Sequence, residues 1–272
     1  MPTFVGKTFN TFFKNILAVD QSSNTGVDAT TRSVQDGDGN NTCFRISDDR
    51  MTILPQNDNM TNTFGVGNTA GSETFAVDTV NQIVKIGRTG TSANTQYAHF
   101  GIHGNDSGWA GASADTHYAV PFTPIGTLST LVSLGSSTSS SFNDTNPATS
   151  LTVATTANSA TSVYWYVMDD ITIDAVKWLH GADTATGEAT AAHLMAYSVD
   201  TANGSTGGDL SSGVVVADGS NITNAGYEQI YYQSMTIQSA DVDAGKIILF
   251  AFASDTVNSD YTINATVKYH IR

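Results

Sequence analysis

The sequence is short of cysteine, proline and charge. A single cysteine, Cys43, excludes an intrachain disulfide and any zinc site built mainly from cysteines. Only 5 prolines occur in 272 residues, and only 13% of the residues are charged. No apolar run approaches the roughly 18 residues of a membrane-spanning helix. Residues 1–6 lack the basic start and apolar core of a signal peptide. We therefore expect no membrane partner.

The few charges are mostly acidic. The chain has 25 Asp and Glu against 11 Lys and Arg, which gives a formal net charge of −14 at pH 7. Such a chain repels phosphate, so we expect it to bind neither nucleic acid nor an anionic lipid surface. Gly is abundant, with 24 residues, and Ser, Thr, Asn and Asp are frequent. These residues favour turns and strand surfaces over helices, and the composition therefore predicts an all-β protein.

The segment TFAVDTVNQIVKIG, residues 74–87, predicts a β-hairpin. Phe75 and Val77 alternate with small or polar residues, a polar turn follows, and Val84 and Ile86 lie on the return strand. An isolated hairpin is only marginally stable in water, and the preceding residues 57–72 are polar and rich in glycine. We expect other copies of the chain to cover the apolar face of this hairpin.

Apolar residues near the N-terminus have the spacing of one helical face. They are Phe9, Phe12, Phe13, Ile16 and Leu17. We interpret them as an attachment segment that docks on another protein or bundles with its own copies. The alternative is a short segment that folds over its own domain.

The C-terminal two thirds of the chain predict a larger β domain. Residues 88–96 have no large apolar side chain and read as a linker, and longer apolar strands follow. Residues 261–271 alternate strictly between apolar and polar, as in an antiparallel sheet with one packed face. Residues 163–168 are apolar at every position and predict a central strand. About eight strands joined by Gly, Ser and Asn loops predict an antiparallel β-sandwich, most simply a jelly roll.

Two segments resemble a known family. The first segment begins at Ile16 and reads ILAVDQSSNTGVDATTRSVQDGDGNNTCFRISDD, and the second is TFAVDTVNQIVKIG. They resemble the N-terminal modules of fibre and virion structural proteins of tailed bacteriophages, especially marine phages. This resemblance covers residues 12–90, and a looser one to the terminal β-sandwich of phage decoration or fibre proteins covers residues 96–272. It implies a homotrimer with an intertwined β-hairpin module, located on the virion surface and attached to other capsid or tail proteins.

The resemblance also implies a division of the chain into three parts. Residues 1–34 would be the attachment segment, residues 35–95 a small trimerising hairpin module with its linker, and residues 96–272 the sandwich head. The expected function is that of a non-enzymatic surface fibre or decoration protein, on the capsid rather than the tail because the chain is short and has no long repeat shaft.

Motifs for catalysis and cofactor binding are missing. The sequence has no Gly-x-Ser-x-Gly elbow and no phosphate-binding Walker loop. Residues 34–41, VQDGDGNN, begin like a calcium loop, but Asn41 and Ser47 stand where Gly and Glu are needed, so a glycine turn is the better interpretation. His99 and His103 share a strand face, yet Gly101 lies between them and no carboxylate is near. We expect no metal and no cofactor.

Two alternatives remain open. A glycan-cleaving enzyme would need paired acids, but the candidates Asp169, Asp170, Asp241 and Asp243 fall in predicted turns, and Glu188 flanks another loop. A tail fibre or receptor-binding protein with a glycan-binding head would need exposed aromatic rings. Trp109, in the loop-like segment NDSGWAG, is the best candidate for a host-glycan contact. Other aromatic residues that could stack on sugars are Tyr118, Trp165, Trp178, Tyr227, Tyr231 and Tyr232, of which Trp165, in the most apolar strand, is better interpreted as a core residue.

Overall fold

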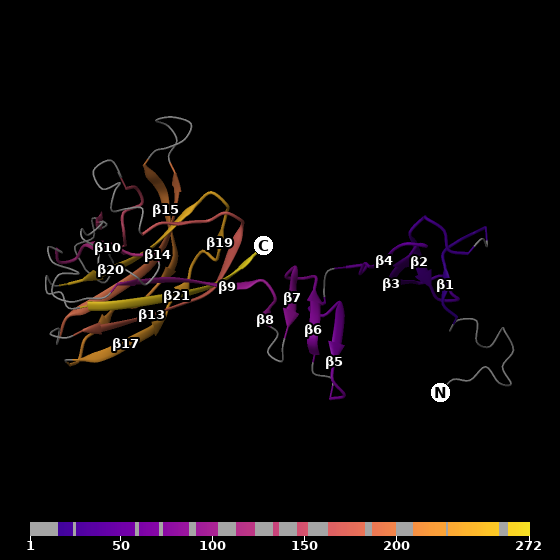
Figure 1. Cartoon of the computed structure of the whole chain (residues 1–272), viewed down its shortest axis with the longest axis horizontal. Helices are drawn as coiled ribbons and strands as arrows, with labels where there is room; N and C mark the ends of the chain where they lie inside the picture. Colours follow the sequence, from indigo (N-terminus) through magenta and orange to yellow (C-terminus); the bar gives the residue numbers. More distant parts are fainter. Residues whose placement is uncertain are drawn as a thin grey trace. The chain divides into compact units, whose positions relative to one another are not determined.

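Strands make up all the regular secondary structure in the described part of the chain. The computed structural model describes residues 16–23, 26–57, 60–70, 73–86, 91–102, 113–122, 133–135, 146–151, 163–182, 187–199, 209–226, 228–255 and 261–272. Every pairing between named strands is antiparallel. The all-β prediction is therefore confirmed. The chain divides into two compact units, Met1–Ala93 and Asn94–Arg272 (Figure 1).

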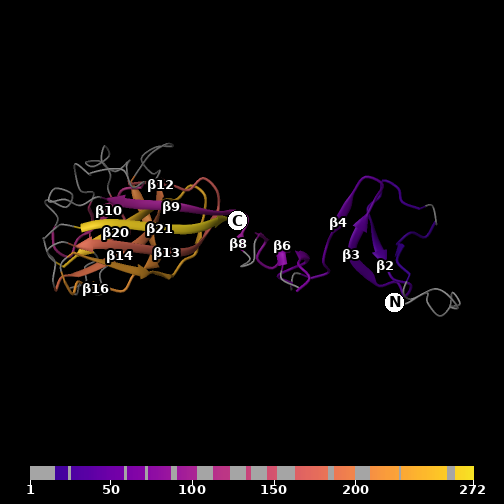
Figure 2. The ribbon, with the colours of Figure 1, turned by 60° about the horizontal axis from the view of Figure 1, so that its bottom comes forward.

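The second unit is a β-sandwich with eight main strands (Figures 1 and 2). These are β9 (Thr95–Ile102), β10 (His117–Val120), β13 (Ile171–Ala182), β14 (Ala189–Val199), β15 (Leu210–Asp218), β17 (Gln229–Ser234), β20 (Ile247–Ser254) and β21 (Tyr261–Ile271). One sheet has the order β17-β13-β21-β9, and the other contains β10-β20-β14-β15. Successive main strands change sheets at every connection except β14–β15. This order and these crossings are those of a jelly roll, as predicted.

Five short strands extend the two sheets. They are β11 (Ser133–Gly135), β12 (Trp165–Tyr166), β16 (Ile222–Thr223), β18 (Thr236–Ile237) and β19 (Asp241–Val242). β19 pairs with β13, and the other four add to the sheet of β10, β20, β14 and β15.

The main core lies between the two sheets of the sandwich. Along β21, Tyr261, Ile263, Ala265 and Val267 are buried, while the residues between them are exposed or half-buried, which confirms the predicted alternation. β20 is buried at all eight positions. Ile248, Phe250 and Phe252 join the core between the sheets, and Ile247, Leu249 and Ala251 pack in a second cluster on the opposite face. This second cluster explains why residues 247–253 are apolar without alternation.

Residues 163–168 do not form the predicted central strand. Only β12 is a strand there, and it pairs with β20 outside the main order. Val163, Trp165 and Val167 are buried, whereas Tyr166 and Met168 are 57% and 80% exposed. The segment is therefore one-sided despite its uniformly apolar sequence. Tyr231 and Tyr232, considered above as glycan platforms, lie in β17.

The first unit consists of two four-stranded sheets. One has the order β1-β2-β3-β4, with β1 (Ala18–Val19), β2 (Arg32–Gln35), β3 (Asn41–Ile46) and β4 (Met51–Ile53). The other has the order β5-β6-β7-β8, with β5 (Phe64–Gly67), β6 (Glu73–Asp78), β7 (Ile83–Ile86) and β8 (Thr91–Ser92). The predicted hairpin is β6–β7. The expected boundary between the attachment segment and the hairpin module, at residues 34 and 35, falls inside β2. In this sheet β2 pairs with β1 on one side and with β3 on the other.

Candidate assembly interface

The turn of the β6–β7 hairpin is held by one buried carboxylate. Asp78, at the end of β6, has no solvent exposure. It accepts hydrogen bonds from the backbone N–H of Asn81 at 3.0 Å and from the Asn81 side-chain amide at 2.8 Å. The Lys85 ammonium lies 2.5 Å from its second oxygen. Burial alone would raise the pKa of Asp78, but Lys85 and the Asn81 donors outweigh burial and lower it to about 2.

The register of this sheet places six apolar side chains on one face. Phe75 lies opposite Ile86, and Val77 lies opposite Val84. On the other side of β6, Phe64 lies opposite Val77 and Val66 lies opposite Phe75. Directly opposed residues of an antiparallel pair project to the same face, so all six share one surface. We call this surface the hairpin face: Phe64, Val66, Phe75, Val77, Val84 and Ile86.

No side chain of the hairpin face is fully buried. Phe64, Val66 and Ile86 are 40%, 50% and 54% exposed, and the other three are half-buried. Phe64 and Phe75 make one edge-to-face contact, with ring centroids 6.1 Å apart. The opposite face holds Ala76, which is the only buried apolar residue among the described residues of the first unit. A sheet of this kind needs a covering layer to be stable.

The sheet of β1–β4 has a similar one-sided surface. Val19 lies opposite Val34, Phe44 opposite Ile53, and Ile46 opposite Met51. Ile46 also lies opposite Arg32, two positions before Val34 on the same strand, so these pairs share a face. We call its apolar residues the N-terminal face: Val19, Val34, Phe44, Ile46, Met51 and Ile53. Arg32, which is paired with Asp28, lies on the same side of the sheet. Phe44 and Met51 are 42% and 67% exposed, and the other four are half-buried.

The opposite side of the β1–β4 sheet is polar. It carries Ser33, Gln35, Arg45 and Thr52, which alternate with the apolar residues along their strands. Both sheets of the first unit therefore have one apolar and one largely polar side, and no second layer of described residues buries the apolar sides.

The structure brings together four of the predicted interface residues and adds others. Phe75, Val77, Val84 and Ile86 share the hairpin face, as their alternation indicated. Sequence reasoning missed Phe64 and Val66, because residues 57–72 looked too polar to contribute a strand. The alternation of these two residues with glycine in FGVG was the available signal. Sequence reasoning also missed the N-terminal face, because its strands are too short to show a clear alternation.

The predicted attachment helix is not observed where the chain is described. Ile16 is half-buried, Leu17 is 65% exposed, and both precede β1 without helical structure. Phe9, Phe12 and Phe13 lie outside the described residues, and so does Trp109.

Four of the five acids considered for catalysis have structural partners within the sandwich. Asp170 accepts the backbone N–H of Ala244 at 2.8 Å, and Asp241 accepts the Thr172 hydroxyl at 2.7 Å. Asp243 lies 2.9 Å from Arg272. Glu188 accepts a short hydrogen bond from the Tyr261 hydroxyl.

The predicted turn at Asp36 is also observed. Its carboxylate accepts the backbone N–H groups of Asp38 and Asn40 and the Asn40 side-chain amide, at 2.8–2.9 Å. Among the described residues, no group of three or more His, Cys, Asp and Glu is arranged to hold a metal ion.

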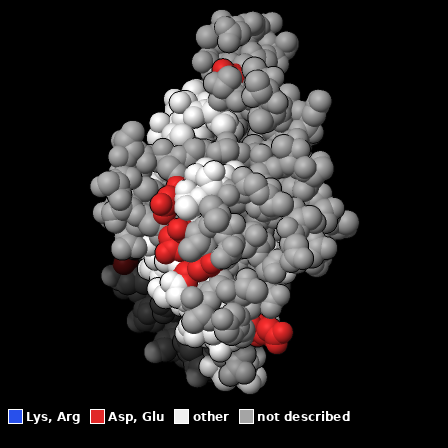
Figure 3. Space-filling view, turned by 90° about the vertical axis from the view of Figure 1, so that its left-hand side faces the viewer, with Lys and Arg blue, Asp and Glu red and all other residues white. Residues whose placement is uncertain are grey.

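The described residues visible on one face of the molecule include Asp and Glu but no Lys or Arg (Figure 3). In the part of the chain that the structure describes, no helix is long and apolar enough to cross a membrane.

Comparisons with known proteins identify no family. No protein-family model matches the chain, and no curated protein matches it. Among solved structures, the chain is similar to one chain of the structure of infectious bursal disease virus, Gx strain, with 10% sequence identity and a TM-score of 0.25. The similarity covers 66% of this chain and 52% of that chain, so it spans about half of the viral chain. At this TM-score and identity it does not establish a shared fold.

Proposed function

We propose that this protein is a non-enzymatic structural protein of a virion surface, built as a homotrimer. The observation that carries the proposal is the pair of one-sided sheets in the first unit. Their twelve apolar side chains have no covering layer in the described chain, and symmetry-related copies would supply one. Closed symmetric association of identical chains is the usual way in which such a surface is buried.

Three copies around one axis would gather their three hairpin faces into one core and their three N-terminal faces into another. Burying an apolar side chain of this size stabilises by about 1.5–3 kcal/mol relative to full exposure. Twelve half-exposed side chains would therefore contribute on the order of 10 kcal/mol per chain. That is comparable with the whole stability of a small domain, whereas Ala76 is the only buried apolar residue among the described residues of the first unit.

The sandwich has a different part in this proposal. It contains its own core between two complete sheets, so it needs no partner to fold. Jelly rolls occur in viral capsid proteins and in lectins, although a fold by itself does not define a function. With the sequence resemblance to phage virion proteins, we assign the sandwich to the outward-facing head, and residues 1–93 to assembly and attachment to capsid proteins.

Light scattering on the recombinant full-length protein tests the oligomer. A chain of 28.6 kDa gives about 86 kDa as a trimer (3 × 28.6). We expect that mass at every concentration down to the micromolar range. A stable monomer would contradict the trimer. It would mean that the apolar faces are covered within the chain or only after docking on the virion.

Location is tested on purified particles. Mass spectrometry of gradient-purified virions should detect the protein, and antibody labelling in electron micrographs should mark the capsid. Labelling of the tail tip would instead support the alternative of a tail fibre with a glycan-binding head. Release of reducing ends from host polysaccharide by the pure protein would contradict the non-enzymatic assignment.

A further inference from the structure

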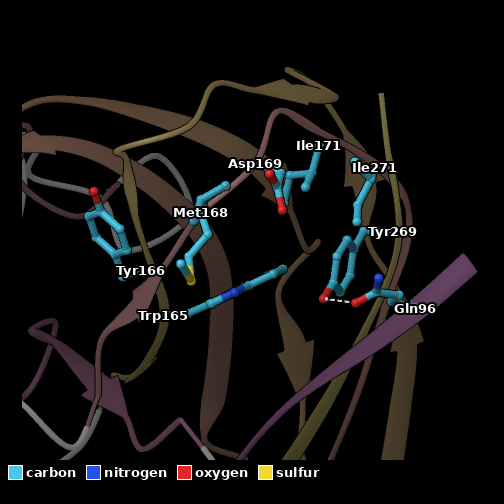
Figure 4. A pocket seen from close by; sticks show the side chains of 9 residues that line it. Gln96, Trp165, Tyr166, Met168, Asp169, Ile171, Tyr269 and Ile271 are labelled. Carbon is cyan, nitrogen blue, oxygen red and sulfur yellow. Dashed lines mark hydrogen bonds between the residues drawn. The ribbon is translucent and has the colours of Figure 1, made fainter. Parts of the chain in front are cut away.

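A groove of about 280 Å³ opens on the sandwich. Its walls come from β12, the connection at residues 167–170, the start of β13, the end of β21 and the start of β9. Figure 4 shows Met168 and Trp165 on one side of the hollow, and Tyr269 and Ile271 on the other. All of the lining residues belong to the second unit, so the groove is complete within the sandwich.

Two aromatic rings form a fixed corner in this groove. The rings of Trp165 and Tyr269 have centroids 4.9 Å apart and are inclined by 55°. Trp165 is also stacked on Phe122, with centroids 5.8 Å apart and planes within 4°. The Tyr269 hydroxyl donates a hydrogen bond to the side-chain oxygen of Gln96 at 2.8 Å (Figure 4). Both rings are held before any ligand arrives, which lowers the entropy cost of binding.

The charge of the groove favours a ligand of positive charge. Among the described residues that line the groove, Asp169 is the only charged one, and it is exposed. None of these described residues is a Lys or an Arg. The nearest arginine in sequence, Arg272, is engaged by Asp241 at 3.5 Å and Asp243 at 2.9 Å. A carboxylate beside aromatic rings attracts a cation and repels an anion.

The rest of the lining argues against a sugar as the preferred ligand. Val167, Met168, Ile171 and Ile271 are apolar, and the Gln96 oxygen already accepts the Tyr269 hydroxyl. Besides Asp169, the polar groups left in the described lining include the Tyr166 hydroxyl and the Gln96 amide N–H groups. A sugar ring carries several hydroxyl groups, and burying them without hydrogen-bond partners costs free energy. An alkylated ammonium group has no such requirement, because it combines charge with an apolar surface.

We propose that this groove binds an organic ammonium group, with Trp165 and Tyr269 as the aromatic corner and Asp169 as the counter-charge. The ligand class is an alkylated ammonium such as that of choline. This inference rests on the sandwich alone and does not depend on the proposed virion function.

The test uses the full-length protein labelled with 5-fluorotryptophan. The chain has 3 tryptophans, so the fluorine spectrum should contain three assignable signals. We expect the Trp165 signal to shift in a saturable way with choline, with a dissociation constant on the order of millimolar, because an exposed cation–π contact is weak. The neutral isostere 3,3-dimethylbutan-1-ol should bind at least several-fold more weakly.

Variants separate the charge from the shape of the site. Asp169→Asn should weaken choline binding about threefold, as expected for a partly exposed ion pair. Glu228→Gln removes the same charge from an exposed turn outside the groove and should leave binding unchanged. Equal binding of the neutral alcohol, a preference for methyl glucoside, or no shift of the Trp165 signal with choline would each overturn the proposal.

Discussion

The carboxylate of Asp78 lies 2.5 Å from the ammonium of Lys85, across the β6–β7 hairpin. Asp78 is fully buried, and it also closes the turn through Asn81. A buried carboxylate is stable only when it is paired and hydrogen-bonded. Asp78 thus has a structural role in this hairpin, since its contacts with Asn81 and Lys85 tie the turn to the return strand.

Acid should loosen this hairpin. The pKa of Asp78 is lowered to about 2, below that of an aspartate in an unfolded chain. Its ionised form therefore stabilises the hairpin at neutral pH, and this contribution is lost as the pH falls from about 4 towards 2. We expect hydrogen–deuterium exchange of residues 73–86, corrected for intrinsic rates, to show lower protection at pH 2.5 than at pH 5. In Asp78→Asn the protection of these residues should be low at both pH 5 and pH 2.5. If the variant lost protection between these two pH values as the unsubstituted protein does, the assignment to Asp78 would be contradicted.

A charge on the hairpin face should break the trimer. Val77→Asp places a carboxylate among Phe64, Val66 and Val84, where the proposed interface would bury it without a partner. We expect light scattering to show loss of the 86 kDa species, about three chains of 28.6 kDa each. Thr74→Asp, at an exposed position on the opposite side of the same strand, is the matched control and should remain trimeric. Equal behaviour of the two variants would argue against the hairpin face as the interface.

Two glycines of the sandwich should respond differently to alanine. A Cβ at Gly213 would lie 2.5 Å and 2.9 Å from ring carbons of Tyr197, which is fully buried, and 3.0 Å from the Cα of Thr149. At Gly181 the nearest atom, the Cβ of Thr262, would be 4.0 Å away. We expect Gly213→Ala to lower the free energy of unfolding by about 1–3 kcal/mol through overpacking. Gly181→Ala should change it by less than about 0.5 kcal/mol in urea denaturation. If both variants lost a similar amount of unfolding free energy, the contact between the new Cβ and Tyr197 would not be the cause of the destabilisation.

The sandwich should be less stable at pH 5 than at pH 8 because of His180. This ring is 1% exposed and stacked between Trp178 and Tyr231, with centroids 4.8 Å and 5.1 Å away. Burial lowers its pKa, although the hydrogen bond to Asn224 at 2.9 Å partly opposes the shift. Its Nδ1 is buried and forms no hydrogen bond within the described structure, so a proton there would have no acceptor.

The sign of this effect follows from proton uptake. The unfolded chain binds a proton near pH 6.5, whereas the folded chain resists it, so stability is present above that pH and falls below it. The loss is at most about 1.4 kcal/mol per pH unit. Thermal unfolding followed by circular dichroism at pH 5, 6, 7 and 8 measures it. His180→Gln should flatten the slope between pH 5 and 7, and an unchanged slope would assign the effect to another group.

Local patterns were enough to identify many strands. Period-two alternation predicted β21 and the β6–β7 hairpin, because it depends only on which neighbours along the chain are apolar. The same reasoning failed at residues 163–168, where every residue is apolar and alternation carries no information. There the structure buries Trp165 and exposes Tyr166 and Met168, and those exposed residues help to form the groove.

The sequence by itself determined the all-β class, the acidic character and the residues of the β6–β7 hairpin, because composition and alternation can be read without knowing which strands pair. Only the tertiary structure decided the jelly-roll order, the meeting of Trp165 with Tyr269, and the union of Phe64 and Val66 with the hairpin face. Each of these depends on the pairing register between distant strands. Register is set by the complete set of cross-strand contacts, and no single stretch of sequence contains that set.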